Sequence, residues 1–316
     1  MKVFVAGATG ALGRQLVPQL VAAGHEVTGM TRSASKQDLA RSLGARPAVA
    51  DALNPDQVAS AVAEAEPEVI VHELTAIPGI RNPRRFGSAF AQTNRLRTEG
   101  TDHLLAAARA VGARRFLVQS FAGWPFARIG GPVKSEEDPL DEAPPKQVRE
   151  TLAAIRYLER AVTGADWIEG IALRYGGFYG PGTSISLEPG ADQLVEMVRK
   201  RRLPIVGEGT GIQSFIQIED AAAATVAAVE RGQPGVYNIV DDEPAPAAEW
   251  VPALAEAVGA KPPRRLPRWL IRLVAGEATV VMMTEVRGAS NAKAKRELGW
   301  ELRYPSWRQG FREGLG

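Results

Sequence analysis

The chain has 316 residues, of which 45% are hydrophobic and 23% charged, a composition typical of soluble globular proteins. Its 38 basic and 36 acidic residues give a net charge of +2, which indicates neither a nucleic-acid partner nor an acidic membrane surface. The absence of cysteine excludes disulfides, thiolate nucleophiles and zinc–thiolate sites, and the three histidines follow no metal-binding spacing. With no signal-peptide or membrane-spanning pattern visible, the sequence predicts a cytoplasmic protein.

The first half of the chain alternates short apolar segments with helical periods. Strands are expected at 2–7, 25–31, 45–51, 68–74, 114–120 and 166–175, and helices between them, including 11–24 and about 86–111. Apolar strands that alternate with helices predict an α/β fold with a Rossmann-type, doubly wound parallel sheet. From Gly182 the pattern changes to a smaller, mostly C-terminal lobe. We therefore expect a Rossmann domain at 1–181 and a second lobe at 182–316. Residues 212–235 are assigned to the second lobe, with a return to the Rossmann domain as the alternative.

The first strand leads into GATGALG (7–13), at its junction with the first helix. Glycines at this spacing permit a tight turn and let the backbone approach a pyrophosphate at the helix N-terminus. At the first strand–helix junction of a repeating βα chain, the pattern predicts a dinucleotide site; a purely structural turn is the alternative. The residues expected to contact the cofactor there are Gly7, Thr9, Gly10, Ala11, Leu12 and Gly13.

The end of the second strand selects between the two nicotinamide dinucleotides. Proteins that prefer NAD carry an acid there, which binds the ribose hydroxyls. This chain has Arg32 and Ser33 instead, and an arginine suits a 2′-phosphate, so the expected cofactor is NADP (NADPH). An exposed arginine that begins a helix is the alternative. Asp51 and Ala52, after the third strand, are expected near the adenine, although Asp51 is equally suited to cap the following helix.

Several segments, in the right order along the chain, point to one family. They are GATGALG (7–13), VIVHELTA (69–76), TNRLRTEGTDHLLAAARAVGARRFLVQS (93–120), LRYGGFYGPG (173–182), QSFIQIEDAAAA (213–224), GVYNIVDDEP (235–244) and AKRELGW (294–300). Together they resemble the extended short-chain dehydrogenase/reductases, in the epimerase/dehydratase branch. The resemblance covers nearly the whole chain. It is specific for the fold and much less specific for the activity.

The resemblance implies roles for individual residues near the cofactor. Leu74, Thr75 and Ala76 match the segment that lines the cofactor ribose. Asn94 matches a structural asparagine nearby, for which a helix cap is the alternative. Tyr175 follows the sixth strand, where the backbone of family members meets the nicotinamide.

The resemblance also locates the catalytic helix, which in the family carries tyrosine, lysine and glutamate four residues apart. Alignment on Glu159 puts Thr151 at the tyrosine position and Ile155 at the lysine position. Tyr157 falls on the polar side of the helix, so the usual proton donor and its lysine are expected to be absent. Ser120 matches the serine that hydrogen-bonds the reacting oxygen, or else is a strand-end turn residue.

Two further residues bear on the reaction. Tyr179 is the expected substitute acid because its loop lies near the nicotinamide end; a packed loop aromatic under Pro181 is the alternative. Gln213 stands where family members that act on nucleotide sugars usually have arginine, which disfavours such a substrate. The apolar stretch at 269–283 is suited to line a pocket or to pack as helices on the sheet.

The sequence therefore predicts an atypical NADP-dependent oxidoreductase, or an epimerase/dehydratase-like enzyme, that acts on a small, apolar carbonyl or hydroxyl substrate. A non-catalytic NADP-binding sensor or scaffold is the alternative, because loss of the tyrosine–lysine pair is expected in such a protein. Neither nucleic acid nor a membrane is an expected partner, and a homodimer is left open.

Overall fold

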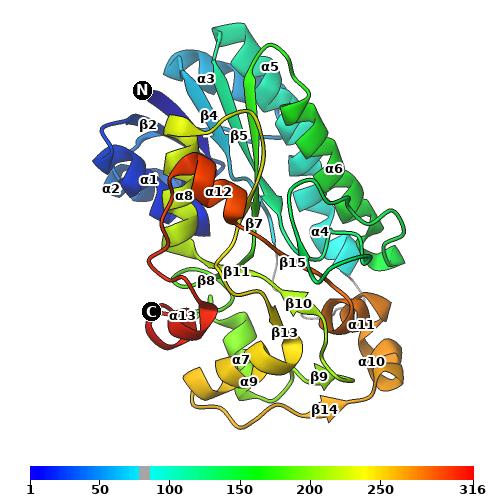
Figure 1. The fold of residues 1–316 in the computed structure, drawn as a ribbon. Helices are drawn as coiled ribbons and strands as arrows, with labels where there is room; N and C mark the ends of the chain where they lie inside the picture. The colour runs from blue at the N-terminus through cyan, green and yellow to red at the C-terminus, as the bar shows by residue number, and fades with distance from the viewer. Residues whose placement is uncertain (78–85) are drawn as a thin grey trace.

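A seven-stranded parallel sheet forms the centre of the computed structural model, which describes residues 1–77 and 86–316 (Figure 1). The strands follow the order β12-β7-β5-β4-β1-β2-β3. They are β1 (Lys2–Ala6), β2 (Glu26–Thr31), β3 (Arg46–Val49), β4 (Val69–His72), β5 (Arg115–Phe121), β7 (Glu169–Tyr175) and β12 (Gly235–Ile239). The strand order reverses direction at β1, so the carboxyl ends of β1 and β4 flank the crevice where such sheets bind ligands. The predicted Rossmann-type fold is confirmed.

Helices cover both faces of this sheet, so its central strands are buried on both sides. Successive residues Phe4 and Val5 of β1 are both fully buried and belong to opposite cores. The core around Val5 is shared with α1 (Ala11–Ala22), α8 (Ile218–Arg231) and α12 (Ala292–Leu298). The core around Phe4 is shared with α3 (Pro55–Ala65), α5 (Thr101–Val111) and α6 (Arg149–Thr163). The short helix α2 (Gln37–Ser42) lies between β2 and β3, and α4 (Phe86–Arg95) joins α5 through a π-helical turn, Leu96–Gly100.

Most of the chain after β7 forms the smaller lobe at the carboxyl edge of the sheet (Figure 1). Its helices are α7 (Gln193–Arg199), α9 (Ala247–Ala257), α10 (Arg268–Ala275), α11 (Glu277–Thr284) and α13 (Trp307–Glu313). Its strands are β8 (Gly177–Tyr179), β9 (Ile205–Val206), β10 (Ile212–Gln213), β11 (Phe215–Gln217), β13 (Ala245–Pro246) and β14 (Arg265–Leu266), while β6 (Val133–Lys134) pairs with β15 (Gly288–Ala289). Aromatic packing among Phe215, Trp250, Trp307 and Phe311 gives this lobe its own core.

After β11 the chain returns to the main sheet, and the returning segment extends further along the sequence than predicted. Helix α8 packs on α1, and β12 then pairs in parallel with β7. Residues 235–239 were expected in the smaller lobe, and the structure instead makes them the edge strand of the main sheet. The apolar sequence of β12 does not reveal which sheet it joins, because that depends on its pairing with a strand some 60 residues earlier. No helix in residues 1–77 and 86–316 is long and apolar enough to cross a membrane.

Candidate functional site

The glycine turn lies at the carboxyl end of β1, directly before α1. Gly7 has a φ of 101°, in the left-handed region that favours glycine. A Cβ on Gly13 would lie 2.3 Å from the carbonyl oxygen of Gly7, so a side chain does not fit where α1 meets the turn. Gly10 precedes α1 and provides no side-chain cap, which leaves the N–H groups of Ala11 and Leu12 to bind an anion. These features fit a dinucleotide pyrophosphate.

The end of β2 lies beside this turn. The Thr9 hydroxyl lies 3.4 Å from Thr31 Oγ1, which also accepts the N–H of Ser33 at 3.4 Å. Arg32 is exposed, and its guanidinium forms no hydrogen bond or ion pair with the described residues. It is therefore available to a phosphate group.

The neighbouring strand end carries the residues expected near the adenine. Asp51 accepts the N–H of Leu53 at 3.0 Å, within its own loop. The cap of α3 is Asn54, whose side chain accepts two N–H groups of the first turn, so the alternative role of Asp51 as that cap is wrong. Ala52 is buried, and its carbonyl oxygen lies 2.9 Å from His103 Nδ1.

The segment after β4 runs along the same edge of the sheet. The N–H of Leu74 donates to His72 Nδ1 at 3.1 Å, and that of Ala76 donates to Thr93 Oγ1 at 3.0 Å. Thr75, between them, is exposed. These bonds hold the segment in place beside the glycine turn, where a cofactor ribose is expected.

Arg97 is a buried cation that the sequence analysis did not single out. Its side chain lies in the π-helical turn and is 6% exposed, and its Nε and one terminal nitrogen have no partner among the described residues. Burial lowers the pKa of Arg97 to about 10. Burial, with a contribution from the Arg97 charge, also lowers the pKa of His72 to about 4, so that ring is neutral. A buried guanidinium without a carboxylate is suited to receive an anion.

Helix α6 has the predicted register. Thr151, Ile155 and Glu159 face the interior, and each is buried. Tyr157 is 37% exposed and donates to the Asp102 carboxylate at 2.7 and 2.8 Å. The interior face of α6 thus presents a hydroxyl and an alkyl group at the two positions where a catalytic pair was sought. Asn94, near the end of α4, donates to Thr151 Oγ1 at 3.4 Å and so lies beside the first of these positions.

Ser120 belongs to a buried network between α6, β5 and β7. Its Oγ donates to Glu159 Oε1 at 2.5 Å. Arg174 donates to both oxygens of the same carboxylate, at 2.8 and 2.7 Å. The Ser120 proton is therefore engaged, and the hydroxyl can donate to a substrate oxygen only by releasing Glu159. A role for Ser120 in catalysis remains a prediction, and its observed contacts are structural.

Two tyrosines at and just after the end of β7 have different surroundings. Tyr175 is the last residue of β7, and its side chain is buried under the sheet edge. Tyr179 ends β8 and lies in the core of the smaller lobe, edge-on to Phe311 with ring centres 5.4 Å apart. A Cβ on Gly310 would lie 2.0 Å from the Tyr179 hydroxyl, which shows how closely α13 covers it. Burial raises the pKa of Tyr179 above its usual value. Tyr179 is therefore buried in the core of the smaller lobe, and a role for it in catalysis remains a prediction.

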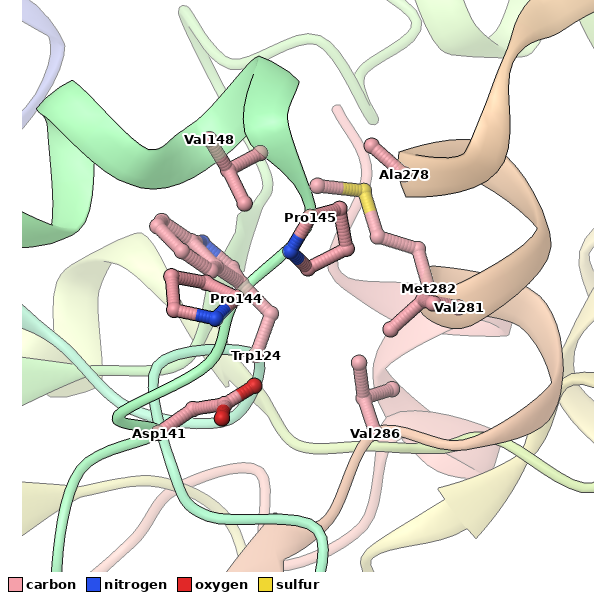
Figure 2. Close-up of a pocket in the computed structure, with 9 residues that line it drawn as sticks. All are labelled: Trp124, Asp141, Pro144, Pro145, Val148, Ala278, Val281, Met282 and Val286. Carbon is pink, nitrogen blue, oxygen red and sulfur yellow. The ribbon is translucent and has the colours of Figure 1, made fainter.

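A narrow apolar pocket lies where the loop after β5 meets α11 (Figure 2). It is lined by Trp124, Asp141, Pro144, Pro145, Val148, Ala278, Val281, Met282 and Val286. Met282 points from α11 toward Pro145 and Val148, and Val148 directly precedes α6. The Trp124 ring is centred 6.3 Å from that of Phe121, the last residue of β5. The pocket therefore adjoins the carboxyl edge of the sheet, close to the interior face of α6.

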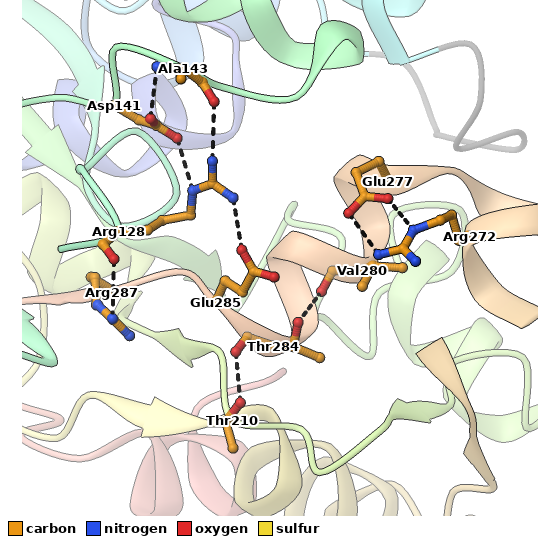
Figure 3. Close-up of polar contacts among 10 residues, drawn as sticks. All are labelled: Arg128, Asp141, Ala143, Thr210, Arg272, Glu277, Val280, Thr284, Glu285 and Arg287. Carbon is orange, nitrogen blue, oxygen red and sulfur yellow. Dashed lines mark hydrogen bonds and ion pairs between the residues drawn. The ribbon is translucent and has the colours of Figure 1, made fainter. Parts of the chain in front are cut away.

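Ion pairs join Asp141, a lining residue of this pocket, to the end of α11 (Figure 3). Arg128 pairs with Asp141 at 3.0 Å and with Glu285 at 2.8 Å, and donates to the carbonyl oxygen of Ala143 at 3.1 Å. These contacts join the loop after β5 to the end of α11. Because Asp141 is paired, the one carboxylate in the lining is neutralised, and the rest of the lining is apolar.

The glycine turn at the end of β1 and the seven-stranded parallel sheet define a dinucleotide-binding protein of the Rossmann class. The family model described as the NAD dependent epimerase/dehydratase family matches residues 3–240. The chain belongs to this family, and the resemblance found in its sequence is confirmed.

Named reductases are among its relatives. A 3-diazoavenalumate denitrifying reductase from a Streptomyces species is 46% identical over 312 residues, which cover 98% of this chain and 99% of the relative. A 2-alkyl-3-oxoalkanoate reductase from Stenotrophomonas maltophilia is 29% identical and covers 82% of this chain and 76% of the relative. The family and these relatives support an enzyme with an oxidoreductase- or epimerase-like role.

Solved structures share the fold at low identity. UDP-glucose 4-epimerase from Thermus thermophilus, in complex with NAD, has a TM-score of 0.75 at 22% identity and covers 100% of this chain and 98% of its own. A human epimerase family protein with NADPH has a TM-score of 0.76 at 20% identity, with 100% and 99% covered. These likenesses extend over the whole chain, and a nicotinamide dinucleotide is the cofactor they support.

Proposed function

We propose that this protein is an NADPH-dependent reductase that replaces the nitrogen of a small aromatic diazo or diazonium compound with hydride. The observation that carries the proposal is the interior face of α6, where Thr151 and Ile155 occupy the expected tyrosine and lysine positions. No acid on that face is ready to protonate a reacting oxygen. The 46% identical relative, whose name gives it a diazo substrate, supports the same chemistry.

The glycine turn and the strand ends would hold the cofactor. Gly7 and Gly13 leave room for a pyrophosphate at the start of α1, and Arg32 and Ser33 would bind the 2′-phosphate of NADPH. Asp51 and Ala52 would lie near the adenine, and the segment at 74–76 would lie along the nicotinamide ribose. When bound, a reduced nicotinamide supplies the hydride.

The chemistry of the acceptor explains why the α6 pair is dispensable. Reduction of a ketone leaves an alkoxide, which must receive a proton from a positioned acid. Replacement of an aryl diazonium group by hydride forms one C–H bond, breaks one C–N bond and releases N₂, and no proton is consumed. Trp124, Val148 and Met282 form an apolar lining beside the interior face of α6 and would exclude water, which would otherwise attack the same carbon.

The test offers the purified protein NADPH with a phenol-derived aryl diazonium salt or with a 2-alkyl-3-oxo acid. We expect ¹⁵N₂ from ¹⁵N-labelled diazonium, and one deuterium in the arene when the nicotinamide carries deuterium at C4. Trp124→Ala should raise KM for the diazonium salt without changing NADPH affinity. Trp269→Ala, a change at a 62% exposed tryptophan on α10, is the matched control.

Other outcomes would identify other functions. Turnover of the oxo acid alone would refute the diazo proposal and require a proton donor that the face of α6 does not supply. NADPH binding without turnover of either substrate would favour the alternative, a non-catalytic sensor or scaffold. A dissociation constant equal for NADPH and NADH would refute the role of Arg32.

A further inference from the structure

We propose that Glu73 is a protonated binding residue beneath the dinucleotide, and that NADPH affinity falls when this carboxyl group ionises. The inference rests on the proposed role of the glycine turn in holding NADPH. It concerns a residue on the opposite side of the sheet from the interior face of α6, and it assigns a function to a buried acid that catalysis does not use.

Glu73 forms the floor under the first glycine of the turn. A Cβ on Gly7 would lie 3.0 Å from the carbonyl oxygen of Glu73 and 3.5 Å from its Cβ. The Glu73 side chain is 6% exposed, and its Oε2 is buried without a partner among the described residues. A buried carboxyl oxygen without a donor is costly if the group is charged. Because Glu73 lies directly behind the turn that would bind the pyrophosphate, an ionised Glu73 carboxylate would also repel the negatively charged cofactor.

The hydrogen bonds around Glu73 indicate that it carries a proton. Thr225 Oγ1 donates to the carbonyl oxygen of Ala221 at 2.7 Å, so its only proton is used. The Tyr175 hydroxyl lies 2.7 Å from Thr225 Oγ1 and 3.3 Å from Glu73 Oε1. Its single proton cannot serve both contacts, and the shorter one to Thr225 needs it. The contact with Glu73 is then satisfied when the carboxyl group is the donor.

The electrostatic surroundings agree with this proton assignment. Burial is the main cause that raises the pKa of Glu73 to about 8, against a smaller opposing effect of Tyr175. Tyr175 is the titratable group that faces Glu73 from β7, while Thr225 of α8 and Gly7 bring no charge. From α1, the Arg14 side chain extends toward Glu188, 4.0 Å away. Among the residues that the structure describes, no cation faces Glu73 to stabilise its ionised form.

The experiment measures the NADPH dissociation constant by nicotinamide fluorescence between pH 7 and 9.5. This range lies above the second ionisation of the 2′-phosphate, near pH 6. We expect affinity to fall about tenfold across it in the parent protein, which corresponds to a one-unit rise in the Glu73 pKa on binding. Glu73→Gln should bind NADPH with an affinity independent of pH. Glu68→Gln, at an exposed residue directly before β4, is the matched control and should behave as the parent.

A second variant tests the proton assignment directly. Thr225→Val frees the Tyr175 proton to donate to Glu73, which favours the carboxylate, so the midpoint of the affinity loss should move to lower pH. An unchanged midpoint, or a Glu73→Gln profile that still follows the parent, overturns the inference. Undetectable NADPH binding at pH 7 refutes the proposed function instead, and with it this inference.

Discussion

Replacing Glu159 with alanine is expected to destabilise the protein strongly, because the change leaves a buried arginine without its counterion. The Arg174 side chain is 6% exposed, and both oxygens of Glu159 accept hydrogen bonds from it. Without the carboxylate, its contacts are the carbonyl oxygen of Glu136 at 3.4 Å and the face of the Phe126 ring, 5.4 Å away. Removal of one partner from a buried ion pair costs about 3–5 kcal/mol, and we expect Glu159→Ala to fall in this range.

The assay is urea unfolding at pH 7, followed by tryptophan fluorescence. Ser120→Ala retains the ion pair and removes one donor to Glu159, so it should cost only about 1–2 kcal/mol. The double variant Glu159→Leu/Arg174→Met removes both charges and should recover most of the stability lost in Glu159→Ala. A loss below about 1 kcal/mol for Glu159→Ala would refute this reasoning. If Ser120→Ala keeps its stability but loses turnover, Ser120 acts on substrate rather than on Glu159.

Four further predictions concern the cofactor site and the helix surface. Arg32→Ala should cost about 1.5–3 kcal/mol in NADPH binding and spare NADH, by calorimetry. Arg97→Met should raise the melting temperature of the ligand-free protein and lower its affinity for NADPH in a titration. If stability and NADPH affinity both rise or both fall, Arg97 does not bind an anion of the cofactor. Tyr157→Phe should change unfolding free energy by no more than about 0.5–1 kcal/mol and leave NADPH binding unaltered. The pKa of Glu73 is raised to about 8 in the folded protein, from a value near 4.5 in the unfolded chain. The stabilisation from its bound proton is therefore complete below pH 4.5 and is lost as the pH rises from 4.5 to 8. Glu73→Gln should remove this decrease in melting temperature with pH, and an unchanged decrease would contradict the prediction.

The sequence predicted those parts of the fold that depend on local order. Strand and helix periods specified six strands of the main sheet, and glycine spacing located the turn at Gly7 because its conformation depends on adjacent residues. The α6 register was also predictable, since a helix of 15 residues has a fixed angular spacing. These features require no knowledge of distant contacts.

The partners across the site could not be predicted in the same way. Glu159 anchored the alignment of the catalytic helix, but its partner Arg174 is identified only by the pairing of β5 with β7. The ion pair between Arg128 and Glu285 joins residues 157 positions apart. Tyr179 was expected near the nicotinamide because its loop follows β7, whereas the pairing of β8 with β11 carries it into the core of the smaller lobe.

Gln213 connects the missing nucleotide-sugar signature to the shape of the pocket. Its Nε2 donates to the carbonyl oxygen of Met282 at 2.9 Å, and so holds the end of α11 against β10. The same turn of α11 places the Met282 side chain in the pocket, opposite Pro145. An arginine in place of Gln213 would bring a charge to this position, and a diphosphate would then have to share the space with the α11 backbone. The neutral amide instead fixes an apolar helix beside the pocket, and this supports the proposal of an aromatic substrate rather than a sugar nucleotide.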